Sequence, residues 1–282
     1  MYLLFDIGGT QTRVGISKMG TTIDASKTVP TPDNFDTGIS TIAAITRELS
    51  GSEKIERAVG GIAGPLDRTH GMLIASPKKN LIHWGGKRLR EALESAIQSP
   101  VLLENDAALG TLGEATAGAG KGVQIVVYMT VSTGVGGSRV VNGAIDPSAF
   151  GFEPGHQLID PTKTLYTNCG EAPGTLENRV SGTALALRFG KPAKEISDAS
   201  VWEELSLWLA YGINNTILHW SPNVLVLGGS MITGDPAIPI ERVTHHLGRI
   251  LTVFPDLPLI KKAELTDSGL WGALALIKSM HS

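Results

Sequence analysis

The stretch YLLFDIGGTQTRVGIS, residues 2–17, decides the fold class of this chain. Its apolar run at 2–5 predicts a buried strand, and the glycine pair Gly8-Gly9 predicts a turn. Residues 12–17 alternate between apolar and polar side chains, which is typical of the return strand of a hairpin. The stretch therefore predicts a strand, a glycine turn and an antiparallel partner.

The same order recurs in the second half of the chain. Residues 124–131 predict a strand, STGVGG (132–137) a turn, and 138–145 a return strand closed by Asn142-Gly143. Two copies of a strand, a glycine turn and a strand predict a duplicated architecture.

Strands and helices alternate along the rest of the chain, which predicts α/β layers. Strands are expected at 57–64, 101–106 and 223–229, and helices at 88–97, 202–220 and 268–280. The longest helix places four apolar side chains on one face, and we predict that they pack in the core. These side chains are Leu205, Leu209, Ile213 and Ile217. No low-complexity linker interrupts the chain, so any boundary between domains is expected to be a hinge.

Composition narrows the class of protein. The 282 residues are 42% hydrophobic and 18% charged, with a net charge of −3, which fits a globular protein and gives no basic stripe for nucleic acid. The single cysteine excludes a disulfide framework and favours the cytoplasm. No apolar run approaches the ~18 residues of a membrane span, and the N-terminus does not resemble a signal peptide. We therefore expect neither a nucleic acid nor a membrane as partner.

Three glycine turns each follow an apolar strand. Such turns let backbone N–H groups approach an anion, although a Gly-Gly pair after a strand is often only a tight hairpin. The first turn adds a carboxylate at Asp6 and a hydroxyl at Thr10, and the second adds Ser132 and Thr133. With the third pair, Gly228-Gly229, they favour two phosphate loops facing each other across a cleft around a nucleoside triphosphate.

The sequence END (104–106) places Asn105 and Asp106 where a strand ends and a helix begins. Either residue type is a favoured helix N-cap. A carboxylate at a strand end also opens onto the usual ligand crevice of an α/β sheet, where it can act as a general base. Both interpretations of Asp106 stay open at this point.

A third group of polar side chains lies within a segment interrupted by glycines. It consists of Glu153, His156 and Glu177. Carboxylates accept hydrogen bonds from sugar hydroxyls, and an imidazole can donate or accept. The group suits recognition of hydroxyls, and the alternative is a solvated loop.

Taken together, these motifs resemble the ROK family of sugar kinases and sugar-responsive repressors, within the actin-like ATPase (hexokinase) superfamily. The motifs are DIGGT, GIAGPLD, NLIHW, END, STGVGG, GFEPGH and VLGG, in the order of the family. The resemblance covers nearly the whole chain. It implies two actin-like, ribonuclease H-like lobes with a cleft between them, a small lobe of 1–104 plus 267–282 and a large lobe of 105–266.

The resemblance also implies roles for individual residues. Those expected to bind ATP are Asp6, Gly8, Gly9, Thr10, Thr12, Ser132, Thr133, Gly134, Gly228 and Gly229. Those expected to bind the sugar are Gly64, Asn80, Asn105, Asp106, Glu153, His156 and Glu177. Asp106 would be the catalytic base, and Asp6 would hold Mg²⁺ through water.

The chain departs from the family pattern at several positions. Gln11 stands where the family often has Lys, and Ser138 replaces a frequent Gly. The family binds structural zinc through one His and three Cys. The corresponding residues here are His156, Thr167, Cys169 and Thr175, with one extra residue between Gly170 and Gly174. Two thiolates are replaced by hydroxyls, so no zinc is expected.

We therefore expect an enzyme that transfers a phosphoryl group from ATP, with Mg²⁺, to a hexose, first of all to O6 of glucose. Fructose and an N-acetylhexosamine remain alternatives. A repressor of the same family would need a winged helix before the first strand, which starts at Tyr2. A non-catalytic sugar-binding regulator would not need Asp106 together with phosphate turns. A homodimer is also expected, although no quoted motif specifies the oligomeric state.

Overall fold

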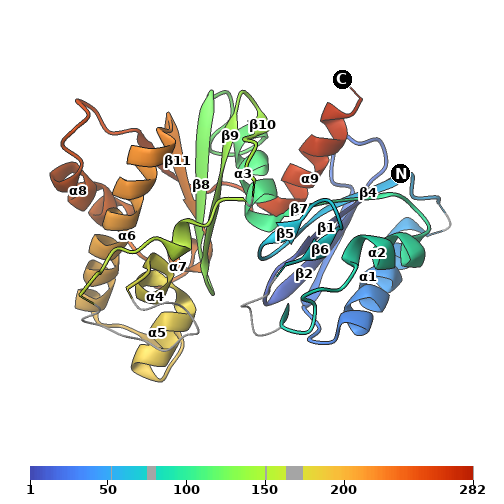
Figure 1. The fold of residues 1–282 in the computed structure, drawn as a ribbon, viewed down its shortest axis with the longest axis horizontal. Coiled ribbons are helices and arrows are strands. Elements are labelled where there is room, and N and C mark those ends of the chain that lie inside the picture. Colours follow the sequence, from blue (N-terminus) through green and yellow to red (C-terminus); the bar gives the residue numbers. More distant parts are fainter. Residues whose placement is uncertain (52, 75–80, 150, 163–173, 282) are drawn as a thin grey trace. The chain divides into compact units, whose positions relative to one another are not determined.

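The computed structural model describes the chain except residues 52, 75–80, 150, 163–173 and 282. The described residues form two compact units (Figure 1). The first unit comprises Met1–Ala117, Pro147–Gly151 and Leu265–Ser282, and the second comprises Gly118–Asp146 and Phe152–Glu264. Every helix in the described part of the chain is too short or too polar to cross a lipid bilayer.

The first unit is built on a five-stranded sheet with the strand order β3-β2-β1-β4-β7. β2 pairs antiparallel with β1 and β3, whereas β1, β4 and β7 are parallel. The strands are β1 (Tyr2–Ile7), β2 (Gln11–Ser17), β3 (Ala25–Pro30), β4 (Arg57–Ile62) and β7 (Val101–Asn105). A separate two-stranded ribbon consists of β5 (Leu66–Asp67) and β6 (Met72–Leu73). The hairpin predicted from residues 2–17 is confirmed.

Helices cover both faces of this sheet (Figure 1). They are α1 (Phe35–Ser50) and α2 (Leu89–Ile97) on one face, and α3 (Asp106–Thr116) and α9 (Ser268–Ser279) on the other. Because successive residues of a strand point to opposite faces, Leu3 and Phe5 join the α1 residue Ile42 in the core, while Asp6 points towards α9.

The second unit repeats this topology. Its sheet has the order β10-β9-β8-β11-β12, again with an antiparallel meander followed by parallel strands. The strands are β8 (Ile125–Val131), β9 (Val135–Val141), β10 (Ala144–Ile145), β11 (Val224–Gly228) and β12 (Leu259–Lys262). The predicted duplication is therefore confirmed.

Helices of the second unit bury one face of its sheet. They are the 3₁₀ turn η2 (Pro154–His156), α4 (Leu176–Val180), α5 (Gly182–Phe189), the 3₁₀ turn η3 (Ala193–Glu195), α6 (Ala199–Trp220), α7 (Ser230–Thr233) and α8 (Ile240–Ile250). The apolar stripe of α6 is buried against Leu247 of α8 and Met129 and Leu225 of the sheet, as predicted. Ser221, in the left-handed conformation, ends α6.

Two predicted boundaries differ from the structure. Residues 138–145 are not one strand, because Asn142 and Gly143 have φ values of 51° and 74° and form a two-residue turn between β9 and β10. Helix α3 lies in the first unit, because it packs against α9, whereas the sequence analysis assigned residues from 105 onwards to the second lobe.

The crossing of α3 and α9 is unusually close. A Cβ on Gly113 would lie 2.2 Å from the carbonyl oxygen of Ser268, and a Cβ on Gly272 would lie 1.9 Å from that of Leu109. Both distances are too short for a non-bonded contact, so neither position has room for a Cβ. The backbones of the two helices therefore touch directly at these glycines. The two glycines set how near α3 and α9 come to each other.

We predict opposite effects for two Gly→Ala changes inside helices. Gly272→Ala must separate α9 from α3 and should lower stability by ~2 kcal/mol or more. Gly248→Ala in α8 meets only a Leu257 methyl at 3.8 Å, so the better helix propensity of Ala should raise stability by ~0.5–1 kcal/mol. Thermal unfolding checks both, and a Gly272→Ala variant as stable as wild type would contradict the close crossing.

Candidate active site

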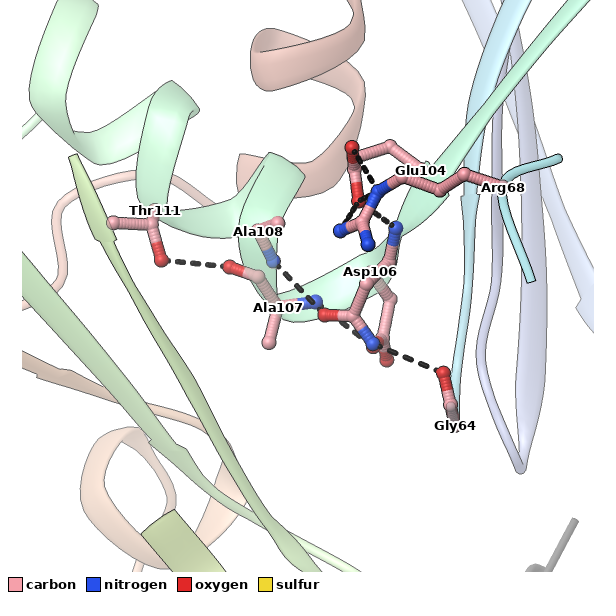
Figure 2. Close-up of polar contacts among 8 residues, drawn as sticks. Gly64, Arg68, Glu104, Asp106, Ala107, Ala108 and Thr111 are labelled. Atoms are coloured by element: carbon pink, nitrogen blue, oxygen red, sulfur yellow. Dashed lines mark hydrogen bonds and ion pairs between the residues drawn. The ribbon is translucent and has the colours of Figure 1, made fainter. Parts of the chain in front are cut away.

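The junction of β7 and α3 carries the predicted base. β7 ends at Asn105 and α3 begins at Asp106. The Asn105 side chain caps the helix, since its Oδ1 accepts from Ala108 N at 3.1 Å, while its Nδ2 donates to the Gly64 carbonyl at 3.1 Å. Figure 2 shows Asp106 in the first turn of α3, where its Oδ1 accepts from Ala107 N at 2.8 Å. The capping function thus falls to Asn105.

Strand order brings Asp6 to the same end of the sheet as Asp106. Asp6 in β1 pairs with Gly61 in β4, which pairs with Glu104 in β7. A Cβ on Gly61 would lie 2.9 Å from the Asp106 Cα, and a Cβ on Gly269 would lie 2.9 Å from the Asp6 Cγ. The missing side chain of Gly61 lets α3 start against β4, and that of Gly269 lets α9 start directly beside the carboxylate of Asp6.

Asp6 lies in a charged and poorly solvated place. Its side chain is 15% exposed, and Arg13 Nη1 lies 3.3 Å from its Oδ2. Arg13 Nε also contacts Asp267 Oδ1 at 3.0 Å. Burial, and then the negative charge of Asp106, raise the pKa of Asp6 to about 7, although Arg13 opposes this shift. A cation bound here would lower the pKa of Asp6, because a nearby positive charge favours the ionised carboxylate.

The residues present fit a magnesium ion held mainly by its other ligands. Mg²⁺ in phosphoryl-transfer sites takes one or two carboxylates and keeps water and phosphate oxygens as the remaining ligands. Asp6 provides a carboxylate of this kind. Within the described residues, no group of three or more His, Cys, Asp or Glu side chains could hold a metal ion.

The first glycine turn is fixed from one side by threonines. Gly8 N donates to Gln11 O at 2.9 Å, and Thr31 Oγ1 donates to the Gly8 carbonyl at 2.7 Å. Thr12 is 1% exposed, and its Oγ1 lies 3.0 Å from Thr31 Oγ1. Thr12 therefore supports the turn from inside the unit, whereas Thr10 is exposed. Contact of Gly8, Gly9 and Thr10 with ATP stays a prediction.

The other two glycine turns meet within the second unit. Ser132 Oγ lies 3.0 Å from Ser230 Oγ, which is the first residue of α7 after Gly229. Gly182 N, at the start of α5, donates to the Ser132 carbonyl at 2.7 Å. The turn at 132–134 is thus flanked by the first residues of α5 and α7, and contact of Ser132 and Thr133 with ATP stays a prediction.

The glycines of these turns differ in what they require. A Cβ on Gly228 would lie 2.4 Å from the Tyr128 hydroxyl, and one on Gly229, whose φ is 84°, would lie 2.4 Å from Val131 O. Packing alone therefore demands both glycines, in addition to the predicted contact with adenosine. Gly134 is not among the residues with positive φ, and its contact with ATP stays a prediction.

The third predicted group gathers around the start of β9. Glu177 Oε2 accepts from Val135 N at 2.6 Å, and a Cβ on Gly155 would lie 2.3 Å from Val135 O. Glu153 and His156 flank this glycine, with 3.8 Å between Glu153 Oε2 and His156 Nε2. Glu177 is 8% exposed, whereas the other two side chains are half-exposed. The structure thus brings the three residues together, and their contact with a sugar stays a prediction.

The segment expected to have lost its zinc is closed at its base by backbone and side-chain bonds. Ile159 N and Asp160 N donate to Gly174 O at 2.9 and 3.0 Å, and Asp160 forms a buried ion pair with Arg179. Thr175 Oγ1 accepts from Asn178 N at 3.3 Å and caps α4. Thr167 and Cys169, like the predicted sugar residue Asn80, lie outside the described residues.

Sequence reasoning missed the charged partners of these sites. They are Arg13 beside Asp6, Arg68 beside Glu104, and Arg179 beside Asp160. Arg13 stands directly opposite Asp6 in the β1–β2 pair, so the hairpin register would have revealed it. The other two pairs join separate elements and leave no local signal.

Comparison with known proteins places this chain among sugar kinases. A sequence model of the ROK family matches residues 2–280. A fructokinase from Lactococcus lactis subsp. cremoris is 30% identical over 211 residues, 71% of this chain and 70% of the relative. An N-acetyl-D-glucosamine kinase from Escherichia coli O127:H6 is 29% identical and aligns over 95% of this chain and 96% of its own. A glucokinase from Halalkalibacterium halodurans is 29% identical, and the alignment covers 100% of this chain and 96% of the relative.

Solved structures agree with the fold described above. A ROK hexokinase from Thermus thermophilus superimposes with a TM-score of 0.81 at 27% identity, covering 100% of this chain and 99% of the other. A ROK glucokinase from Streptomyces griseus, in complex with glucose and AMPPNP, gives a TM-score of 0.81 at 25% identity. The superposition covers 98% of this chain and 99% of the other.

The duplicated sheet topology and these comparisons define a sugar kinase, a phosphotransferase with the actin-like ATPase fold. The chain belongs to the ROK family. The resemblance read from the sequence motifs and the predicted α/β fold are both confirmed.

We predict that Asp6 makes stability depend on pH. Its pKa of about 7 in the folded state exceeds the value of 3.8 for an unperturbed Asp, so the folded protein binds this proton more tightly than the unfolded chain. Stability from this group is present at low pH and is lost as pH rises through 7, by on the order of 4 kcal/mol.

Asp6→Asn tests this expectation. Without Mg²⁺ and nucleotide, the variant should gain thermal stability over wild type as pH rises from about 4 to 7, and the gain should level off above pH 7. A difference in melting temperature that does not change with pH would contradict the raised pKa.

Proposed function

We propose that this ROK kinase transfers the γ-phosphoryl group of ATP to a hexose, with glucose at O6 as its main substrate and Asp106 as general base. The observation that carries the proposal is the convergence of Asp106, Asn105 and Asp6 at one end of the first sheet. The hexose hydroxyl would lie against Asp106, and the phosphates would lie against the glycine turns.

In the proposed reaction, the hexose oxygen attacks the γ-phosphorus in line with the leaving ADP oxygen. The bond between that oxygen and the γ-phosphorus breaks, and the hydroxyl proton passes to Asp106. Asn105 keeps Asp106 in place, because it caps α3 and bonds to Gly64. Mg²⁺, held by Asp6 through water, would neutralise charge that develops on the phosphoryl oxygens.

The choice of hexose rests on the group around Val135. Glu153, His156 and Glu177 offer two carboxylates and an imidazole, which match a ring with several hydroxyls. A glucokinase aligns over 100% of this chain, and the Streptomyces griseus structure contains glucose. Fructose and N-acetylglucosamine, named in other relatives at similar identity, are the alternatives.

A hexose screen with detection of ADP tests the activity and the substrate together. Wild type should release ADP with glucose, ATP and Mg²⁺, and kcat/KM for glucose should exceed that for fructose, N-acetylglucosamine and N-acetylmannosamine.

Asp106→Asn keeps the shape of the side chain but cannot accept the proton, so kcat should fall by ~10² or more, while sugar binding weakens far less. Sugar binding without ADP release would indicate a regulator, and a variant with most of the wild-type kcat would exclude Asp106 as the base.

We further propose that no structural zinc binds near His156. Only His156 and Cys169 remain as nitrogen or sulfur ligands of the four that such a site needs. The bonds of Gly174 and the Asp160–Arg179 ion pair support this proposal, because they close the base of the segment without metal.

Elemental analysis of untagged protein should find far less than one zinc per chain. Activity should survive a zinc chelator in excess Mg²⁺. Near-stoichiometric zinc, with activity lost on chelation and restored by zinc, would refute the proposal.

A further inference from the structure

An ion pair lies directly behind the proposed catalytic base (Figure 2). Arg68 Nε lies 3.1 and 3.0 Å from the two carboxylate oxygens of Glu104, and Arg68 Nη2 lies 2.5 Å from Oε1. Glu104 belongs to β7 and is only 13% exposed, whereas Arg68 comes from the turn between β5 and β6. A guanidinium that meets both carboxylate oxygens fixes direction as well as distance.

The same carboxylate also holds the backbone of the site. Glu104 Oε1 accepts from Asn105 N at 2.7 Å, so one oxygen joins Arg68 to the residue that precedes Asp106. The side-chain Nδ2 of Asn105 donates to the Gly64 carbonyl at 3.1 Å. Residues 64–68 are therefore tied twice to the end of β7, once by charge and once by the Asn105 side chain.

Arg90 in α2 fixes the far side of the turn that carries Arg68. Its Nη1 donates to Thr69 O at 3.3 Å, and its Nη2 donates to Arg68 O. Gly71 N closes the turn on Asp67 O at 2.8 Å. Helix α2 thus holds the backbone of Arg68. The Arg68 side chain can therefore fix the distance between the β5–β6 turn and β7.

We propose that Arg68 and Glu104 are positioning residues for the acceptor sugar. They fix the distance between Gly64 and the Asn105–Asp106 pair, and hence the place of the hexose hydroxyl relative to Asp106. This inference rests on the proposed function, because it assigns the pair to the sugar side of that site. The turn at Gly8–Thr10 has its own support from Thr31 and does not depend on the pair.

Arg68→Met tests the inference, because it removes the guanidinium and keeps an unbranched apolar side chain. The KM for the sugar should rise ~10-fold or more, because the pair holds Gly64 and Asn105, which are proposed to bind the sugar, and kcat should fall as well, since small displacements of a reacting group are costly. The KM for ATP should stay within ~2-fold of wild type, because the Gly8–Thr10 turn does not depend on the pair. Uniform damage to the protein would instead change the KM values of both substrates. Arg68→Lys should restore part of the sugar KM, because one ammonium can still meet the carboxylate.

Arg88→Met is the matched control. Arg88 also pairs with a glutamate of the first unit, Glu91 at 2.6 Å, but both side chains are exposed, at 71% and 58%. This variant should leave both KM values unchanged. If Arg68→Met folds poorly, Glu104→Gln is the second variant, since it keeps an oxygen for Asn105 N and removes only the charge. It should also raise the sugar KM selectively.

The possible results distinguish the positioning role of Arg68 and Glu104 from the proposed function itself. Equal changes in both KM values, or none, in an active Arg68→Met or Glu104→Gln variant would refute the positioning role and leave the proposed function standing. A wild-type protein that phosphorylates no hexose would refute the proposed function, and the inference with it. A selective loss of sugar affinity that Arg68→Lys partly restores would support both.

Discussion

The first unit depends on close approach of backbones where side chains are missing. Gly113 and Gly272 let α3 and α9 cross within contact of each other's carbonyls, and Gly61 and Gly269 let the first turns of the same helices reach the sheet. Strand order brings Asp6 and Asp106 to one end of the sheet, and these approaches let α3 and α9 begin there. A Cβ at any of the four positions would displace α3 or α9 from the sheet or from the other helix.

That closeness has an electrostatic cost. Burial and the neighbouring Asp106 make the ionised form of Asp6 unfavourable, and Arg13 compensates only in part. A site with this imbalance favours a cation, because the positive charge stabilises the form that burial disfavours. The stability of the free protein, and the affinity for Mg²⁺ that we propose for this site, would thus depend on the same buried charge.

The duplicated topology carries different chemistry in its two copies. Asp6 pairs with Gly61 in the first sheet, and Thr130 pairs with Gly228 at the corresponding place in the second. The first copy therefore places a carboxylate beside its turn, while the second has hydroxyls at Thr130 and Ser132. The two copies of the topology therefore offer different functional groups at the ends of their first strands.

The sequence by itself determined the elements whose signals are local. Period-2 alternation gave the hairpin at 2–17, helical periodicity gave the buried stripe of α6, and the order strand, END, helix gave the place of Asp106. Such signals lie within a few residues of the structure that they encode. The tertiary structure alone decided that α3 belongs with α9, that Arg68 meets Glu104, and that Asp160 meets Arg179. Strand order and helix packing create these contacts between separate elements, and no local pattern can specify which distant side chain will fill a given place.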